Sequence, residues 1–176
     1  MATKLLTFRR LLEADVETHV HGSVDTLINI RVEPQGFDVG AEYNLLRERS
    51  ENSGAIVLFT GLVRDFNADG AIDGIILEHY PAMTQKTLQT IVQRALSKWQ
   101  LDAVTIIHRV GKLLNHDQIV LVGVSARHRE AAFDGASFIM DFLKTEAPFW
   151  KKEVTPQGDA QWVDAKVSDQ RARERW

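Results

Sequence analysis

Residues 118–154, QIVLVGVSARHREAAFDGASFIMDFLKTEAPFWKKEV, hold the pattern that decides the fold. The segment opens with an apolar run, which predicts a buried strand over 118–125. Apolar residues then recur every three or four positions, which predicts a helix over 129–145. One face of this helix is expected to carry Phe133, Ala136, Met140 and Leu143. Pro148 ends the helix, and a short strand is expected over 149–154.

A similar series of elements lies upstream. A strand is predicted over 72–80 and is stopped by Pro81, and a helix with apolar positions three and four residues apart follows over 84–99. A strand over 103–110 is then expected to form a hairpin with the strand over 118–125, through the connection GKLLNHD. The order strand, helix, strand, strand, helix, strand is typical of a split βαβ unit. Such a unit places both helices on one face of an antiparallel sheet, in the α+β class.

The elements that precede this unit have clear signals too. Residues 28–32 alternate between apolar and polar side chains, as a half-buried strand does. Asp38 can cap a helix, and we expect that helix to turn Leu45 and Leu46 inward. Residues 54–63, GAIVLFTGLV, are a short apolar run rich in β-branched residues, which predicts a central strand.

The chain is expected to hold one domain with an appendage. The compact domain is predicted over 27–176, where two short strands surround the turn TPQGDA and a charged tail follows as a last helical turn or a mobile arm. Residues 1–26 are expected to be an N-terminal extension, mobile or folded as a short amphipathic helix.

Composition excludes several classes of function. The 176 residues include 21 Lys and Arg against 24 Asp and Glu, a net charge of −3, which disfavours bulk binding of nucleic acid. There is no cysteine, so the chain itself offers no thiol nucleophile and no zinc-thiolate or iron–sulfur ligand. The sequence contains no run of 18 apolar residues, so no membrane span is predicted. The acidic residues near the start argue against a targeting peptide, and a cytoplasmic protein is expected.

Common nucleotide-binding and serine-hydrolase motifs are missing as well. The sequence contains no GxGxxG, no Walker A loop and no GxSxG. His19 and His21 have no acidic or cysteine partners at ligand spacing, so linker residues are expected there and not a metal site.

Three basic residues mark positions suited to an anion. His128 and Arg129 come at the start of the second helix, where free backbone N–H groups and the positive dipole end favour negative charge. A polar loop between strand and helix explains the same pair without a ligand. Arg64 ends the strand over 54–63, and an arginine there can bind a phosphate or carboxylate in a bidentate way.

Three lysines follow on the C-terminal side of the same helix. Lys144 is in its last turn, and Lys151 and Lys152 are on the next strand, where alternation lets one of the two face the helix end. A lysine in a partly dry site among other cations loses proton affinity and can act as a base or nucleophile. A solvated basic surface is the alternative. Two further pairs, Glu78–His79 and His108–Arg109, are interpreted as structural.

Several strings resemble one family, the large catalytic subunit of molybdopterin synthase. They are GLVRDFN, LEHYPAMTQKTL, IIHRVGKL, HDQIVLVGVSARHREAAFDG, FIMDFLKTEAPFWKKE and WVDAKVSDQRARERW. The similarity runs from about residue 30 to residue 176 and leaves out the N-terminal extension. The resemblance implies an α/β hammerhead fold with a small added β subdomain.

The same resemblance implies a reaction and its partners. The family converts cyclic pyranopterin monophosphate into molybdopterin, in molybdenum cofactor biosynthesis. Its sulfur arrives as a thiocarboxylate on the C-terminal glycine of a small ubiquitin-like subunit, which suits a chain without cysteine. Two large subunits form a central homodimer with one small subunit at each end, a heterotetramer. No metal, bound cofactor, nucleic acid or membrane is implied.

Site residues are implied position by position. Lys144 and Lys151 match the family's LKT and FWK lysines and are expected to be catalytic, with Lys144 the main residue held beside Lys151. The matching substrate-binding positions are Arg64, His128, Arg129, Lys152, Glu153 and Lys166. Of these, Lys166 stands where relatives often have arginine and reaches over from the other large subunit. Leu62 departs from relatives that carry lysine there.

Two other classes of function use the same residues. A phosphate-ester or acyl-phosphate hydrolase on a split βαβ fold would turn over without a partner protein. A non-catalytic scaffold would keep partner binding without binding the substrate.

Overall fold

The computed structural model describes residues 27–50, 52–67, 70–163 and 167–176. The expected N-terminal extension, 1–26, therefore lies outside the described residues. The elements in chain order are β1 (Leu27–Glu33), α2 (Val39–Glu48), β2 (Ala55–Leu62), β3 (Phe66–Asn67), β4 (Gly70–Ala71), β5 (Gly74–His79), α3 (Pro81–Lys98), β6 (Leu101–Arg109), β7 (Gly111–Leu114), β8 (Gln118–Ala126), α4 (Arg129–Glu146), β9 (Phe149–Val154), β10 (Ala160–Val163) and α5 (Val167–Arg173).

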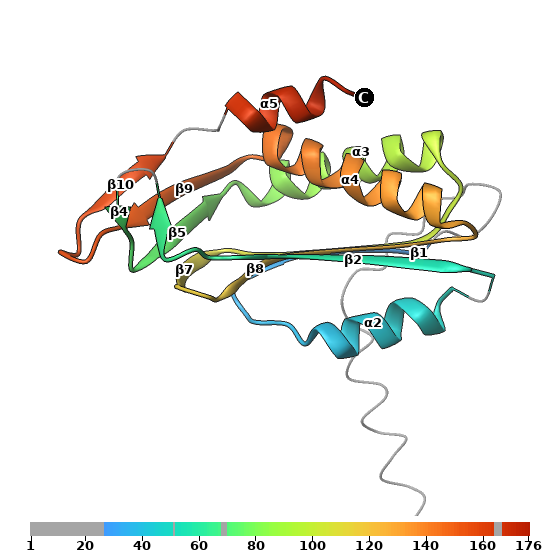
Figure 1. Cartoon of the computed structure of the whole chain (residues 1–176), viewed down its shortest axis with the longest axis horizontal. Coiled ribbons are helices and arrows are strands. Elements are labelled where there is room, and N and C mark those ends of the chain that lie inside the picture. The colour runs from blue at the N-terminus through green and yellow to red at the C-terminus, as the bar shows by residue number, and fades with distance from the viewer. Residues whose placement is uncertain (1–26, 51, 68–69, 164–166) are drawn as a thin grey trace, which may run out of the picture.

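The first sheet is the larger layer of the molecule. Its strand order is β1-β6-β8-β2, with β1 parallel to β6 and the other two pairs antiparallel. Helices α3 and α4 cover one face, and α2 lies across the other (Figure 1). The two long helices therefore share a face, as the sequence predicts.

The second sheet contains the two outer strands of the predicted split βαβ unit, β5 and β9. Its order is β10-β9-β5-β7, and all its pairs are antiparallel. The antiparallel pairs β6–β8 and β5–β9 both form, but in different sheets, because β2 and not β5 occupies the place beside β8. The connection GKLLNHD contains β7, which pairs with β5. The α+β class with an added β subdomain is thus confirmed.

Strand β2 is an edge strand, so the prediction that residues 54–63 form a central strand is wrong. It pairs with β8 on one side only, and Phe59 on it is 40% exposed. An apolar run reports a tendency to be buried and does not report how many neighbours a strand has.

Two helical side chains also differ from expectation. Asp38 caps α2 as predicted, because its side chain accepts a hydrogen bond from the Ala41 N–H at 2.7 Å. Leu46 on that helix is buried, but Leu45 is 42% exposed. Phe133 on α4 is 60% exposed, whereas the rest of its predicted face is buried. Each exposed residue lies near the border of an apolar stripe, where periodicity does not fix the side.

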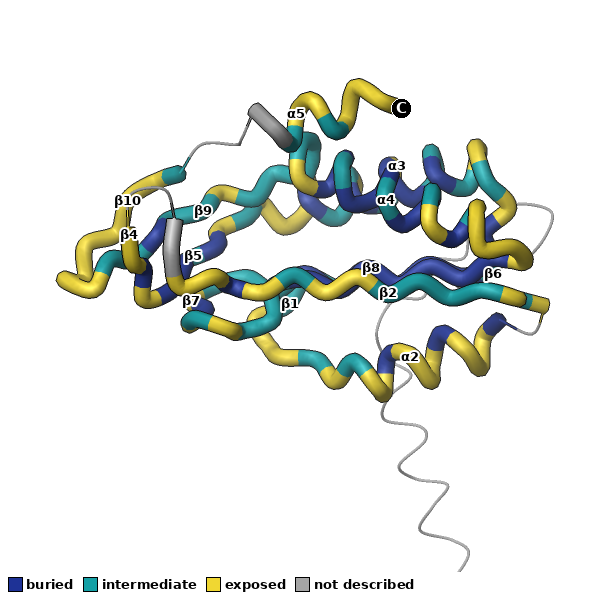
Figure 2. Tube along the Cα trace, viewed as in Figure 1, coloured by how far each residue is buried: buried dark blue, intermediate teal, exposed yellow. Residues whose placement is uncertain are grey.

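The main core lies between the first sheet and the helices α3 and α4. Figure 2 shows its buried trace along β6, β8 and the facing sides of both helices. Its largest fully buried side chains include Leu88, Ile91, Ile106, Phe138 and Ile139. A smaller core under the second sheet contains Val63, Ile72, Ile75, Leu77 and Leu113.

The charged tail forms helix α5, which lies against α4 (Figure 1). Asp141 on α4 accepts hydrogen bonds from Arg175 Nη2 and from the Trp176 indole N–H, both at 2.7 Å. The Trp176 ring packs edge-on against Trp99 and Phe138, with centroids 5.5 and 5.6 Å apart. These contacts hold α5 beside the last turn of α4.

Candidate active site

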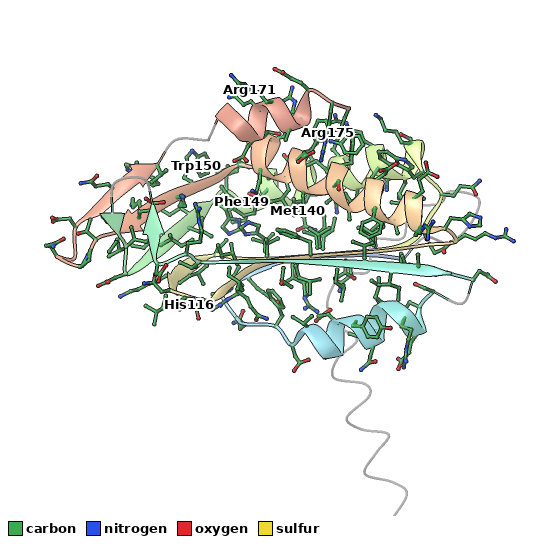
Figure 3. The ribbon with its side chains drawn as sticks, in the orientation of Figure 1. His116, Met140, Phe149, Trp150, Arg171 and Arg175 are labelled. Atoms are coloured by element: carbon green, nitrogen blue, oxygen red, sulfur yellow. The ribbon has the colours of Figure 1, made fainter. Side chains whose placement is uncertain are left out.

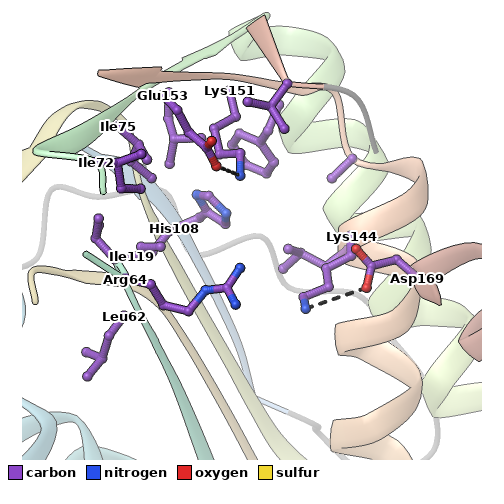
Figure 4. A pocket seen from close by; sticks show the side chains of 16 residues that line it. Leu62, Arg64, Ile72, Ile75, His108, Ile119, Lys144, Lys151, Glu153 and Asp169 are labelled. Atoms are coloured by element: carbon purple, nitrogen blue, oxygen red, sulfur yellow. Dashed lines mark hydrogen bonds and ion pairs between the residues drawn. The ribbon is translucent and has the colours of Figure 1, made fainter. Parts of the chain in front are cut away.

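A cavity of about 540 Å³ lies where the two sheets meet the C-terminal end of α4 (Figure 4). Most of its lining is apolar and comes from both cores. Its polar lining residues are Arg64, His108, Lys144, Lys151, Glu153 and Asp169. They come from the end of β2, from β6, α4, β9 and α5, so distant parts of the chain build one site.

Lys144 enters the cavity from the last turn of α4. The neighbouring Leu143 is buried in the main core and fixes the rotation of the helix at this point. The Lys144 side chain is half exposed, and its Nζ lies 3.8 Å from Asp169 Oδ1 on α5. A cation at a helix C-terminus also compensates the negative end of the helix dipole.

Lys151 and Glu153 share the cavity face of β9. Lys151 Nζ donates a hydrogen bond to Glu153 Oε1 at 2.8 Å, and the Glu153 side chain is only 10% exposed. Lys144 and Lys151 therefore line one cavity, but each has its own carboxylate. Figure 4 shows the two amines entering from different walls.

Lys152 lies on the opposite face of β9, outside the lining of the cavity. Its Nζ donates to Glu78 Oε1 at 2.7 Å and lies 4.1 Å from the centre of the Trp162 ring. The expected alternation between the two adjacent lysines is confirmed. Glu78 and His79 point to opposite faces as well, since His79 stacks on Phe149.

Arg64 follows β2 and sends its guanidinium into the cavity between His108 and Lys144 (Figure 4). Leu62, two residues earlier, lines the same wall and is 51% exposed. The pairing register of β2 with β8 shifts between Gly61 and Leu62, and both lining side chains follow this irregularity.

His108 is the lining residue that sequence reasoning set aside as structural. It is 5% exposed, and its ring stacks on Phe149 with centroids 3.8 Å apart and planes 12° apart. Burial lowers the pKa of His108 to about 4, a hydrogen bond to the Arg109 carbonyl opposes the shift, and the charge of His79 adds to it. A histidine within the apolar string TIIHRV is a weak signal, and the stacking of its ring on Phe149 of β9 is visible only in the structure.

His128 and Arg129 lie at the other end of α4, and both are exposed. A helix of 18 residues spans about 27 Å at 1.5 Å per residue, so the pair is far from Lys144 of the same chain. Lys166 lies outside the described residues. Within the described part of the chain, no group of three or more His, Asp or Glu side chains is arranged to hold a metal ion.

Phe149 and Trp150 are adjacent on β9 and face opposite sides of the strand. The backbone and sticks in Figure 3 place Phe149 facing the core side and Trp150 facing outward, in agreement with the 49% exposure of Trp150. Phe149 lines the cavity, so it and not Trp150 is the aromatic ring that limits water there.

Comparisons with known proteins agree on one family. The family model described as MoaE protein matches residues 32–146. The molybdopterin synthase catalytic subunit of Escherichia coli (strain K12) is 54% identical over 147 residues, which cover 84% of this chain and 97% of that protein. A relative with the same description from Ralstonia nicotianae is 53% identical and covers 84% and 83% of the two chains.

A solved structure has the same fold. The molybdopterin biosynthesis MoaE protein from Burkholderia ambifaria has a TM-score of 0.73 and 47% identity, and the match covers 85% of this chain and 98% of that one. Sequence and structure thus agree over nearly the full length of the relatives, and the chain belongs to the MoaE protein family.

Proposed function

We propose that this chain is the catalytic subunit of a molybdopterin synthase. It would convert cyclic pyranopterin monophosphate into molybdopterin with sulfur from the C-terminal thiocarboxylate of a small ubiquitin-like subunit. The observation that carries the proposal is the cavity, where Arg64, Lys144 and Lys151 converge in a chain whose net charge is −3. The E. coli relative, 54% identical, is named molybdopterin synthase catalytic subunit.

The chemistry needs the kind of site that the cavity offers. The substrate carries a cyclic phosphate and the sulfur donor is an anion too, so fixed cations reduce the repulsion between them. Holding the sulfur near the attacked carbon converts an encounter between two molecules into a step within one complex. The chain has no cysteine, so the sulfur would have to come from the partner.

Lys144 is the residue to which we assign proton delivery. Sulfur has to displace oxygen, and the departing oxygen needs a proton, which an ammonium group can supply. Lys144 is half exposed and its ion pair with Asp169 is long at 3.8 Å, so its amine can turn toward a ligand. Lys151 is held at 2.8 Å by Glu153 and serves better as a fixed positive charge.

A second copy of the chain would complete the site. His128 and Arg129 are suited to a phosphate at a helix start, but they lie a helix length away from Lys144 in their own chain. We propose that they, and Lys166, serve the cavity of the partner copy in a homodimer. The tetramer would then be two large subunits at the centre and one small subunit at each end.

The remaining parts of the proposal concern the chain as a whole. Residues 27–176 would form the catalytic domain, and 1–26 would add nothing that the reaction needs. The location would be the cytoplasm. None of the helices in the described ranges is long and apolar enough to cross a membrane.

The decisive experiment is reconstitution. The purified chain is incubated with the thiocarboxylated small subunit and cyclic pyranopterin monophosphate, and dithiolene product is measured. The small subunit with an ordinary carboxylate is the control and should give none. Phosphate release without any small subunit would favour a hydrolase, and partner binding without binding of the pterin would favour a scaffold.

A further inference from the structure

The ring of His108 is held in one orientation at the cavity wall. The stacked ring of Phe149 covers one face of it, and its Nδ1 lies 2.9 Å from the Arg109 carbonyl oxygen. A carbonyl oxygen can only accept a hydrogen bond, so Nδ1 carries the proton in the neutral ring. The other nitrogen, Nε2, then has a free lone pair.

Nε2 is the atom that the protein leaves open to a ligand. Among the described residues it has no hydrogen-bond partner, and it is not one of the fully buried polar atoms left unpaired, whereas Nδ1 of His79 is. His108 lines the cavity, and Figure 4 shows its ring on the wall that faces Arg64 and Lys144.

Nε2 of His108 is an uncharged hydrogen-bond acceptor in a cavity lined by cationic side chains. The cavity holds three cationic side chains, and its two carboxylates are engaged, Glu153 with Lys151 and Asp169 with Lys144. His108 is neutral near pH 7 because its pKa is about 4. The cavity therefore offers cations for the charged part of a ligand and one uncharged acceptor for another part.

We propose that His108 Nε2 accepts a hydrogen bond from an uncharged N–H or O–H group of the substrate. The cationic residues would bind the phosphate, while His108 would read the heterocyclic part and set its orientation. This rests on the proposed function for the identity of the substrate. It makes His108 a binding and specificity residue, because a ring that gains a proton only near pH 4 is a weak base at neutral pH.

Two substitutions separate the acceptor from the rest of the ring. In His108→Asn the amide nitrogen can keep the bond to the Arg109 carbonyl, but nothing reaches the position of Nε2. In His108→Gln the amide oxygen can occupy that position as an acceptor, while the bond to Arg109 is lost. His116→Asn is the matched control, because His116 is exposed, is not among the cavity-lining residues and has a φ of 68°, which asparagine tolerates.

The test measures dissociation constants of cyclic pyranopterin monophosphate and of inorganic phosphate for the four proteins. For the pterin, His108→Asn should bind about tenfold more weakly, since the substrate donor is left unpaired in the cavity, and His108→Gln should be nearer to wild type. His116→Asn should not differ from wild type, and phosphate binding should stay the same in all four. With the thiocarboxylated small subunit present, KM should rise in His108→Asn while kcat changes little.

Three results would overturn the inference. They are unchanged pterin binding in His108→Asn, an equal loss for the pterin and for phosphate, and an equal loss in the Asn and Gln variants. Thermal melting of each variant identifies a folding defect. If the Asn variant is unfolded, a loss of pterin binding of about tenfold in a folded His108→Gln variant, which keeps an acceptor, would still overturn the inference. Failure of the wild type to form dithiolene would instead refute the proposed function, since the binding comparison does not need turnover.

Discussion

Acid should destabilise this protein through His108, and the substitution His108→Asn should remove that effect. Burial is the main cause that lowers the pKa of His108 from 6.5 to about 4. Between these two values the unfolded chain binds a proton that the folded chain does not. Stability therefore falls as the pH drops from about 6.5 toward 4, and above that window His108 contributes no pH dependence.

The size of the effect follows from the shift. The pKa difference is 6.5 − 4 = 2.5 units, and at about 1.4 kcal/mol per unit the full loss is about 3 kcal/mol once the pH is well below 4. Between about pH 7 and about pH 5 the loss amounts to about 2 kcal/mol, a large part of the stability of an ordinary domain. The charge of His79 opposes an added proton as well, and the two carboxylates that line the same cavity, Glu153 and Asp169, are each paired with a lysine.

Urea unfolding followed by tryptophan fluorescence measures this loss, because the partly buried rings of Trp99 and Trp176 pack against the main core. Wild type, His108→Asn and the control His116→Asn are compared at about pH 7 and about pH 5. Other groups titrate equally in all three, so the difference between wild type and His108→Asn isolates the buried ring. Equal losses of stability in these two proteins would refute the reasoning.

Three further outcomes are expected. Lys144→Ala should slow single-turnover product formation by about 10²- to 10⁴-fold at saturating thiocarboxylated partner without weakening partner binding, and Lys144→Arg should rescue poorly; a near-normal rate would move the role to Lys151 or to the partner's tail. The chain should be a dimer by light scattering. Coexpression of Lys144→Ala with the double variant His128→Ala, Arg129→Ala should restore about a quarter of the activity, because about half of the dimers are mixed and each mixed dimer has one intact site of two. No activity should return if each site belongs to one chain. Deletion of 1–26 should leave the rate within a few fold of wild type, and a large loss in a folded variant would contradict the assignment of this segment.

Local signals in the sequence are enough to predict most helices and strands and to recognise the family. The cap at Asp38, the apolar spacing of α3 and α4 and the proline that follows α4 each act within a few residues, so they appear in the sequence as they do in the structure. The alternation in β9 predicted that only one of Lys151 and Lys152 faces the cavity, and Lys151 does.

Long-range relations were harder to foresee. The place of β2 at the edge of its sheet and the separation of β5 from β8 depend on which strands compete for one neighbour, and periodicity does not report this. The sequence analysis interprets His108 as structural for a similar reason. Its place at the cavity depends on the second sheet and on Phe149, which is 41 residues away in sequence. The distance between His128 and Lys144 follows from helix length alone and was available in the sequence.

The cavity at the junction of the two sheets has a consequence for the order of folding. Its lining runs from Leu62 to Asp169, and the pairs of β5 with β9 join residues about 75 positions apart. Contacts of such sequence separation form slowly, because a long loop has to close before they are gained, while the helices need only neighbours. During refolding, the far-UV circular dichroism of the helices should therefore recover before the ability to bind the pterin. A ligand that binds only the finished cavity would stabilise the native state after the second sheet has formed. It would therefore lower the unfolding rate more than it raises the folding rate.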